Sequence, residues 1–139
     1  MNNQGMKTHT DFFQMMLDGT TYYDAKVLDL QVLVCGDEVV LYYEDEGEFC
    51  WKVEFLFCHQ LQYEYAEGTD WRKLPDVKAM KREQLDRRVQ GIRVQDSELE
   101  GFYDIEIDLD GLEVFVRCKD LSVKRVKEQD VDFFWRKNQ

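Results

Sequence analysis

Apolar and polar side chains alternate with a period of two along much of this chain, which predicts β-strands. Residues 29–34 and 39–43 are rich in β-branched and aromatic residues, and Gly36-Asp37 between them suits a two-residue turn. The resulting hairpin would place one apolar set on one face, with three facing pairs: Val34 and Val39, Val32 and Leu41, Leu30 and Tyr43.

A second hairpin is predicted around Asp110-Gly111, because Asp-Gly between two alternating runs is the strongest short hairpin signal. The flanking runs are residues 102–109 and 112–118. Their register would again bring apolar residues together: Leu109 with Leu112, Ile107 with Val114, Ile105 with Val116. Residues 121–126 are expected to add another strand.

The region between the hairpins also alternates. Residues 49–57 and 61–65 keep the same spacing, and a bend near His59 would divide them into two strands. Residues 67–74 read as a loop, and residues 92–94 as a short edge strand.

Two helices are expected. Thr8 or Thr10 can cap a short helix that Gly19 ends, since threonine and glycine favour these two positions. Pro75 and Asp76 would open a second helix over 76–88, ending before Gly91.

These elements predict an α+β fold: a twisted antiparallel sheet of about six or more strands, built from hairpins and covered on one face by one or two helices. Residues 8–139 would form one domain and residues 1–7 a flexible tail.

Charge restricts the partners of this domain. The chain has 18 basic and 29 acidic residues, a net charge of −11 that disfavours binding to nucleic acid or to anionic membranes. Seven of the basic residues lie between residues 72 and 88, in and beside the expected second helix. The sequence shows neither a membrane span nor a secretory signal, so we expect a cytoplasmic protein.

One face of the second hairpin is acidic. Asp104, Glu106 and Asp108 project from one side of their strand, and Asp108 would face Glu113. Such a face is either simply solvated or binds a basic protein; paired carboxylates for acid–base chemistry or a divalent ion are a third interpretation. Tyr42, Tyr63 and Tyr65 are either sheet residues or aromatic anchors for the same partner.

No catalytic or metal-binding constellation is apparent. The four cysteines are expected to be reduced, and Cys58-His59 lacks the further ligands that a zinc site needs. Glycine-rich phosphate loops and a Gly-x-Ser-x-Gly motif are also missing from the sequence. We therefore expect a non-enzymatic protein with no cofactor and no metal.

The chain resembles the small acidic immunity proteins of bacteria in size, charge and its acidic–aromatic strands, such as Tyr103-Asp104-Ile105-Glu106 and Trp51-Lys52-Val53-Glu54. The resemblance spans residues 20–127. It implies a stoichiometric inhibitor whose carboxylates occupy a basic toxin surface, with Asp104, Glu106, Asp108 and Glu113 in that role.

Two other hypotheses remain. One is a small-molecule-binding or enzymatic domain, with a pocket between sheet and helix lined by tyrosine and tryptophan or placed around Cys58-His59. The other is a homodimer formed through an exposed sheet edge.

Overall fold

The computed structural model describes residues 8–66 and 76–139. Within these ranges it contains one α-helix and six strands: α1 (His9–Asp18), β1 (Val27–Leu33), β2 (Glu38–Glu44), β3 (Phe49–Tyr65), β4 (Gly91–Asp96), β5 (Tyr103–Asp108) and β6 (Leu112–Lys127). The strands form one antiparallel sheet in the order β1-β2-β3-β6-β5-β4. The predicted α+β fold is confirmed. The expected tail (1–7), the expected loop (67–74) and Pro75 lie outside the described residues.

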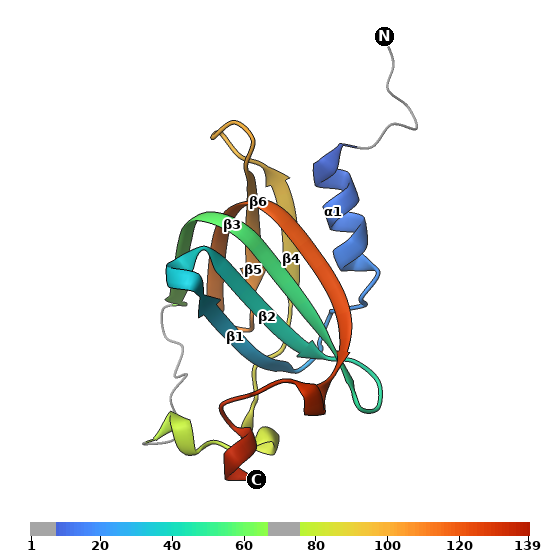
Figure 1. Cartoon of the computed structure of the whole chain (residues 1–139), viewed down its shortest axis with the longest axis vertical. Coiled ribbons are helices and arrows are strands. Elements are labelled where there is room, and N and C mark those ends of the chain that lie inside the picture. Colours follow the sequence, from blue (N-terminus) through green and yellow to red (C-terminus); the bar gives the residue numbers. More distant parts are fainter. Residues whose placement is uncertain (1–7, 67–75) are drawn as a thin grey trace.

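Two long strands join the halves of the sheet. β3 and β6 run side by side through its middle, with β1 and β2 on one flank and β5 and β4 on the other (Figure 1). β3 is a single strand, so the predicted division near His59 is wrong; a bulge between Cys58 and Gln60 shifts its register instead. Residues 121–126 continue β6 rather than forming a strand of their own. The sheet can therefore bend without being interrupted.

The first hairpin forms, but its register differs from the prediction by two residues. Val32 faces Val39 and Leu30 faces Leu41, because the turn occupies four residues, 34–37. Val34 and Cys35 have φ angles of 51° and 54°, and Gly36 has 95°. A shift of two residues keeps Leu30 and Val32 on their expected face, since the strand period is two, whereas Val34 leaves the strand and lies in the turn.

Val34 is strained because a β-branched residue rarely adopts the left-handed conformation. Its side chain is 65% exposed, so it contributes little to the core. Val34→Asn is expected to raise the free energy of unfolding by about 1 kcal/mol, since asparagine tolerates positive φ. Val32→Asn is the control: Val32 is 52% exposed on regular strand, and this change should lower stability slightly. Urea denaturation of both variants measures the difference, and equal effects would contradict the strain argument.

The second hairpin has the predicted register. Ile107 faces Val114 and Ile105 faces Val116, and the Leu109 N–H donates to the Leu112 carbonyl at 2.9 Å. Asp110 and Gly111 have φ angles of 56° and 93°, as a type I′ turn requires.

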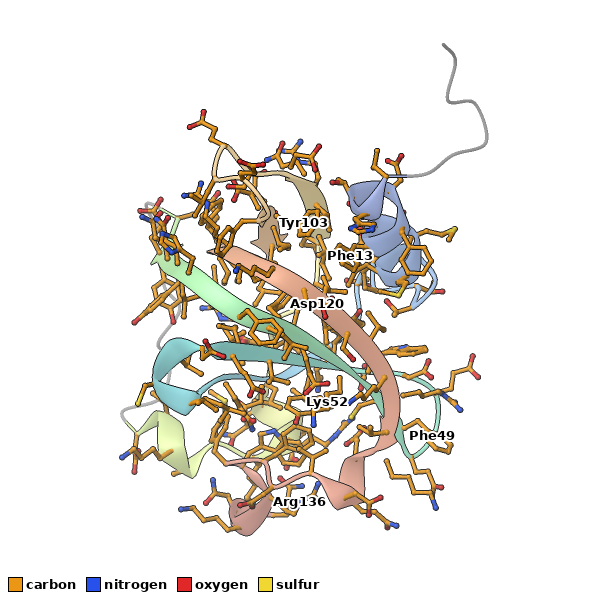
Figure 2. The ribbon with its side chains drawn as sticks, turned by 45° about the horizontal axis from the view of Figure 1, so that its top comes forward. Phe13, Phe49, Lys52, Tyr103, Asp120 and Arg136 are labelled. Carbon is orange, nitrogen blue, oxygen red and sulfur yellow. The ribbon has the colours of Figure 1, made fainter. Side chains whose placement is uncertain are left out.

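Helix α1 forms as expected and covers the outer edge of β4. The Thr8 side chain accepts a hydrogen bond from the Asp11 N–H, and Gly19 is the C-cap. Gln14 donates to the Ile92 carbonyl and accepts from the Val94 N–H, at 2.9 and 2.8 Å. Figure 2 shows Phe13 of the helix beside Tyr103 of β5, and their ring centroids lie 5.0 Å apart. The helix thus satisfies backbone groups that an edge strand otherwise exposes.

The predicted second helix is wrong. Residues 76–88 contain two short 3₁₀ turns, Val77–Ala79 and Arg82–Gln84, followed by extended chain. Arg82 makes ion pairs with Glu44 at 2.9 Å and Glu128 at 3.0 Å, and the Val27 N–H donates to the Arg87 carbonyl. These contacts with the sheet and the C-terminal region replace the intrahelical hydrogen bonds, so tertiary contacts override the helical pattern.

The core has two parts. The main cluster lies on the face of the sheet that carries Leu41, Phe55 and Ile107. The second lies on the other side of β2, where the C-terminal residues Phe133 and Trp135 pack. Residues 39–43 are consequently buried on both faces. Among the described residues, no helix has the length and apolar character to cross a membrane.

Candidate functional site

The predicted acidic residues lie on one outer sheet face, in cross-strand rows. Asp108 faces Glu113 on β6, and Glu113 in turn faces Glu64 on β3. In the rows alongside, Glu106 faces Phe115 and Asp104 faces Arg117. The side chains of these residues alternate with the buried positions of the same strands, so they point away from the main core.

Two of the predicted carboxylates are already paired with arginines. Asp104 accepts two hydrogen bonds from Arg117, at 2.8 and 3.1 Å, and Glu106 forms an ion pair with Arg93. Hydrogen bonding from Arg117 is the main cause that holds the pKa of Asp104 below its ordinary value of 3.8; burial partly opposes it. Asp104 is therefore a structural partner of Arg117 within the chain.

Asp104→Asn is expected to lower the free energy of unfolding at neutral pH, because it removes this ion pair. A carboxyl group with a depressed folded-state pKa stabilises the protein above 3.8, and this contribution is lost as the pH falls through the lower, folded-state pKa. The difference between variant and wild type should therefore shrink in acid. Urea denaturation at a series of pH values measures it. Asp130→Asn, at an exposed position, is the control and should change stability by less than about 0.5 kcal/mol. A difference that persists unchanged in acid would refute the assignment.

Glu64, Glu113 and Asp108 form an acidic row without an arginine or lysine partner among the described residues. All three side chains are exposed. Like charges directly opposite each other destabilise a sheet, so this row has an energetic cost that the Asp104 and Glu106 pairs avoid. Within the described part of the chain, no three His, Cys, Asp or Glu side chains are placed to hold a metal ion.

A broad hollow of about 1280 Å³ borders this part of the sheet, and residues of both sheet faces contribute to its lining: Glu64 and Glu113 from the outer face, Tyr63 and Val114 from the opposite one. It is lined by residues of β3, β4, β5 and β6, and by Gln14, Asp18 and Tyr22 in and after α1. Its charged lining residues are five acids and one base, a formal charge of −4: Asp18, Glu64, Glu106, Asp108, Glu113 and Arg93. Phe115 and Tyr63 add aromatic surface. The hollow therefore combines negative potential with a few apolar contacts.

The three candidate tyrosines have different environments. Tyr63 is 65% exposed and lines the hollow. Tyr65 is half-buried under the Arg87 guanidinium, whose Cζ lies 5.0 Å from the ring centroid. Tyr42 is only 4% exposed and packs edge-to-face against Phe133. Tyr42 is thus a core residue, and we correct its placement on the binding surface.

A second, smaller hollow of about 430 Å³ lies at Cys58 and His59, bordered by the β1–β2 turn. The Cys58 thiol donates to the Phe55 carbonyl at 3.2 Å, and Cys58 faces Cys118 across the strands. Hydrogen bonding with Cys118 is the main cause that lowers the pKa of Cys58, and it raises the pKa of Cys118. The His59 ring lies against Phe102, with centroids 5.4 Å apart. The four cysteines are all free thiols.

The sequence prediction missed Glu64 and Asp18. Glu64 alternates with Tyr63 and Tyr65 in sequence, which marked it as a polar strand position. Its place beside Glu113 depends on the pairing of β3 with β6, two segments far apart in the chain. Asp18 reaches the hollow because α1 lies along β4.

Comparison with solved structures shows a similar fold in an uncharacterized protein from Neisseria gonorrhoeae. The TM-score is 0.53 at 12% sequence identity, and the match covers 74% of this chain and 92% of that one. No curated protein matches the sequence. A family model described as Immunity protein PIM7 matches residues 10–125. This match covers most of the sheet and all the lining of the acidic hollow. The chain therefore belongs to the immunity protein PIM7 family.

Proposed function

We propose that this protein is a non-enzymatic immunity protein of the cytoplasm that neutralises a basic protein toxin by binding it at the acidic hollow. Membership of the PIM7 family supports the immunity role. The observation that carries the choice of site is the acidic row of Glu64, Glu113 and Asp108. The free thiols agree with a reducing compartment.

Within the described part of the chain no arginine or lysine offsets the repulsion in the acidic row, so the row favours a cationic partner. Three neighbouring carboxylates lower stability, and cationic side chains of a partner would relieve that repulsion. By contrast, Asp104 already has a cation of its own in Arg117. We therefore assign toxin contact to the acidic row and a structural role to Asp104. Glu106 shares both features, because it pairs with Arg93 and also lines the hollow.

Charge and shape would act at different stages of binding. The formal charge of −4 around the hollow would steer a basic surface toward it and raise the association rate. Phe115 and Tyr63 would then supply the apolar contacts that slow dissociation. The toxin is inhibited because its basic surface is occupied, with no chemical step.

The size of the hollow favours a protein over a small molecule. Pockets for small ligands have volumes of roughly 300–1000 Å³ and are mostly apolar. The hollow of about 1280 Å³ is larger and carries six charged side chains. Residues of both the sheet and α1 line it, as the small-molecule hypothesis requires, but its lining contains tyrosine and no tryptophan.

The test uses the protein encoded by the gene beside that of this protein as the candidate toxin, called the neighbouring-gene toxin. Cells that produce the toxin should survive when this protein is co-produced, and the two purified proteins should form a complex that titration calorimetry detects. The complex should weaken as salt rises. Absence of both protection and complex formation would refute the immunity role, whereas a complex insensitive to salt would refute the acidic site.

A further inference from the structure

We propose that the toxin supplies a β-strand, with basic and apolar side chains in alternation, that pairs with the free edge of β3 over residues 60–64. This inference rests on the proposed function and specifies how the toxin is held. This surface, the β3 edge, comprises the outer backbone groups of Leu61 and Tyr63 with the side chains around them.

The β3 edge exists because β2 is shorter than β3. Pairing between these strands runs from Glu44 opposite Cys50 to Glu38 opposite Leu56. Beyond Cys58, β3 pairs with β6 on one side, and no described strand lies on the other. The smaller hollow lies where β2 leaves, between the turn at 34–37 and residues 58–61.

The backbone orientation follows from one hydrogen bond. The Ala66 N–H donates to the Gly111 carbonyl of the hairpin turn at 2.8 Å. Hydrogen-bonded residues alternate in an antiparallel ladder, so Gln62 and Glu64 also bond to β6. Leu61 and Tyr63 then direct their N–H and carbonyl groups away from β6. This is the side on which β2 pairs with residues 50–56, earlier in the same strand.

The outer edges of the sheet, on β4 and β1, are covered more than the β3 edge is. Gln14 of α1 bonds to the outer groups of Ile92 and Val94 on β4. On β1 the Trp135 indole donates to the Leu28 carbonyl, and the Leu30 N–H donates to the Asp29 carboxylate. Within the described ranges the β3 edge has no comparable cover, and Tyr63 is 65% exposed there.

The side chains at this edge specify the chemistry of an added strand. On the outer face, a residue of that strand beside Glu64 would extend the acidic row, where a cation is favoured. On the opposite face, its neighbours would be Leu61 and Tyr63, which favour apolar side chains. Alternating basic and apolar residues satisfy both faces, and backbone hydrogen bonds would add affinity.

Amide hydrogen exchange of the labelled protein, alone and bound to the neighbouring-gene toxin, tests this pairing. In the free protein the Gln62 and Glu64 amides should be protected and the Leu61 and Tyr63 amides should exchange rapidly. Toxin binding should slow exchange at Leu61 and Tyr63 by at least about tenfold. A bound complex in which those amides exchange as before would overturn the inference and leave the proposed function intact. If no complex forms, both fail.

Proline variants provide an independent test. Tyr63→Pro removes an outward N–H and leaves the bonds to β6 in place, since edge strands tolerate proline at such positions. We expect it to weaken toxin binding by about tenfold or more beyond Tyr63→Thr, which lacks the ring but keeps the N–H. Val32→Pro is the matched control. The Val32 N–H points away from β2, as the Leu30 N–H does two residues earlier, and this variant should bind the toxin normally. Protection at Gln62 and Glu64 verifies the fold of each variant.

Two results would assign the edges differently. Weakened binding by Val32→Pro together with normal binding by Tyr63→Pro would place the toxin at β1 and overturn the inference. Protection of Leu61 and Tyr63 in the free protein that rises with protein concentration would show that a second copy of this chain occupies the β3 edge, which would also overturn it.

Discussion

Phe133→Ala is expected to lower the free energy of unfolding by about 3–5 kcal/mol. Phe133 is 2% exposed, stacks on Trp135 at a centroid distance of 4.9 Å and meets Tyr42 edge-to-face at 5.1 Å. Alanine would leave a cavity between the C-terminal segment and β2, because these aromatic neighbours cannot fill the space of a lost ring. Urea denaturation measures the loss.

Phe134 offers a matched control for this prediction. It is the next residue in the chain and has the same side chain, but it is 38% exposed. Phe134→Ala should cost less than about 1 kcal/mol, since an exposed truncation leaves no cavity. If Phe133→Ala lowers the free energy of unfolding as little as Phe134→Ala does, the second cluster does not stabilise the sheet. Residues 131–135 lie outside the range 10–125 that the family model matches. The packing of Phe133 and Trp135 against β2 therefore comes from a segment that the family match does not include.

The second large effect is expected when the acidic row is neutralised. The triple variant Glu64→Gln, Asp108→Asn, Glu113→Gln should bind the toxin with an association rate about ten- to a hundredfold lower, and with a weaker dependence on salt. Its free energy of unfolding should rise by up to about 1 kcal/mol, because repulsion within the row is removed. Stopped-flow kinetics and urea denaturation measure the two quantities.

A control triple variant carries the same change of net charge elsewhere. Glu46→Gln, Glu100→Gln, Asp130→Asn alters three exposed positions outside the hollow. It should keep most of the association rate, since the local field around the hollow is intact. If both triple variants associate equally slowly, overall charge rather than the acidic row attracts the toxin.

The two hairpins show what a local pattern can predict. Asp110-Gly111 supplies the positive φ angles of a two-residue turn, so its register followed from the sequence. In the first hairpin the positive φ angles begin at Val34, a residue type that rarely adopts them. The sequence therefore favoured a tighter turn at Gly36 than the one that forms.

The remaining differences arise from contacts between distant segments. Residues 76–88 have a weak helical pattern, but Arg82 bonds to Glu44 and Glu128 on other elements. The sequence left Tyr42 open between a sheet residue and a binding anchor, and it is buried because the C-terminal segment packs against β2. Three of the four predicted acidic residues line the hollow, and Glu64 completes the row only through the pairing of β3 with β6. Sequence spacing cannot predict such long-range pairing.

Zero-length carbodiimide crosslinking of the complex with the neighbouring-gene toxin tests the acidic site most directly, because it joins a carboxylate to a lysine only when the two are in contact. Mass spectrometry of the products should identify Glu64, Asp108 or Glu113 linked to toxin lysines. Crosslinks confined to Glu46, Glu100 or Asp130 would contradict the account.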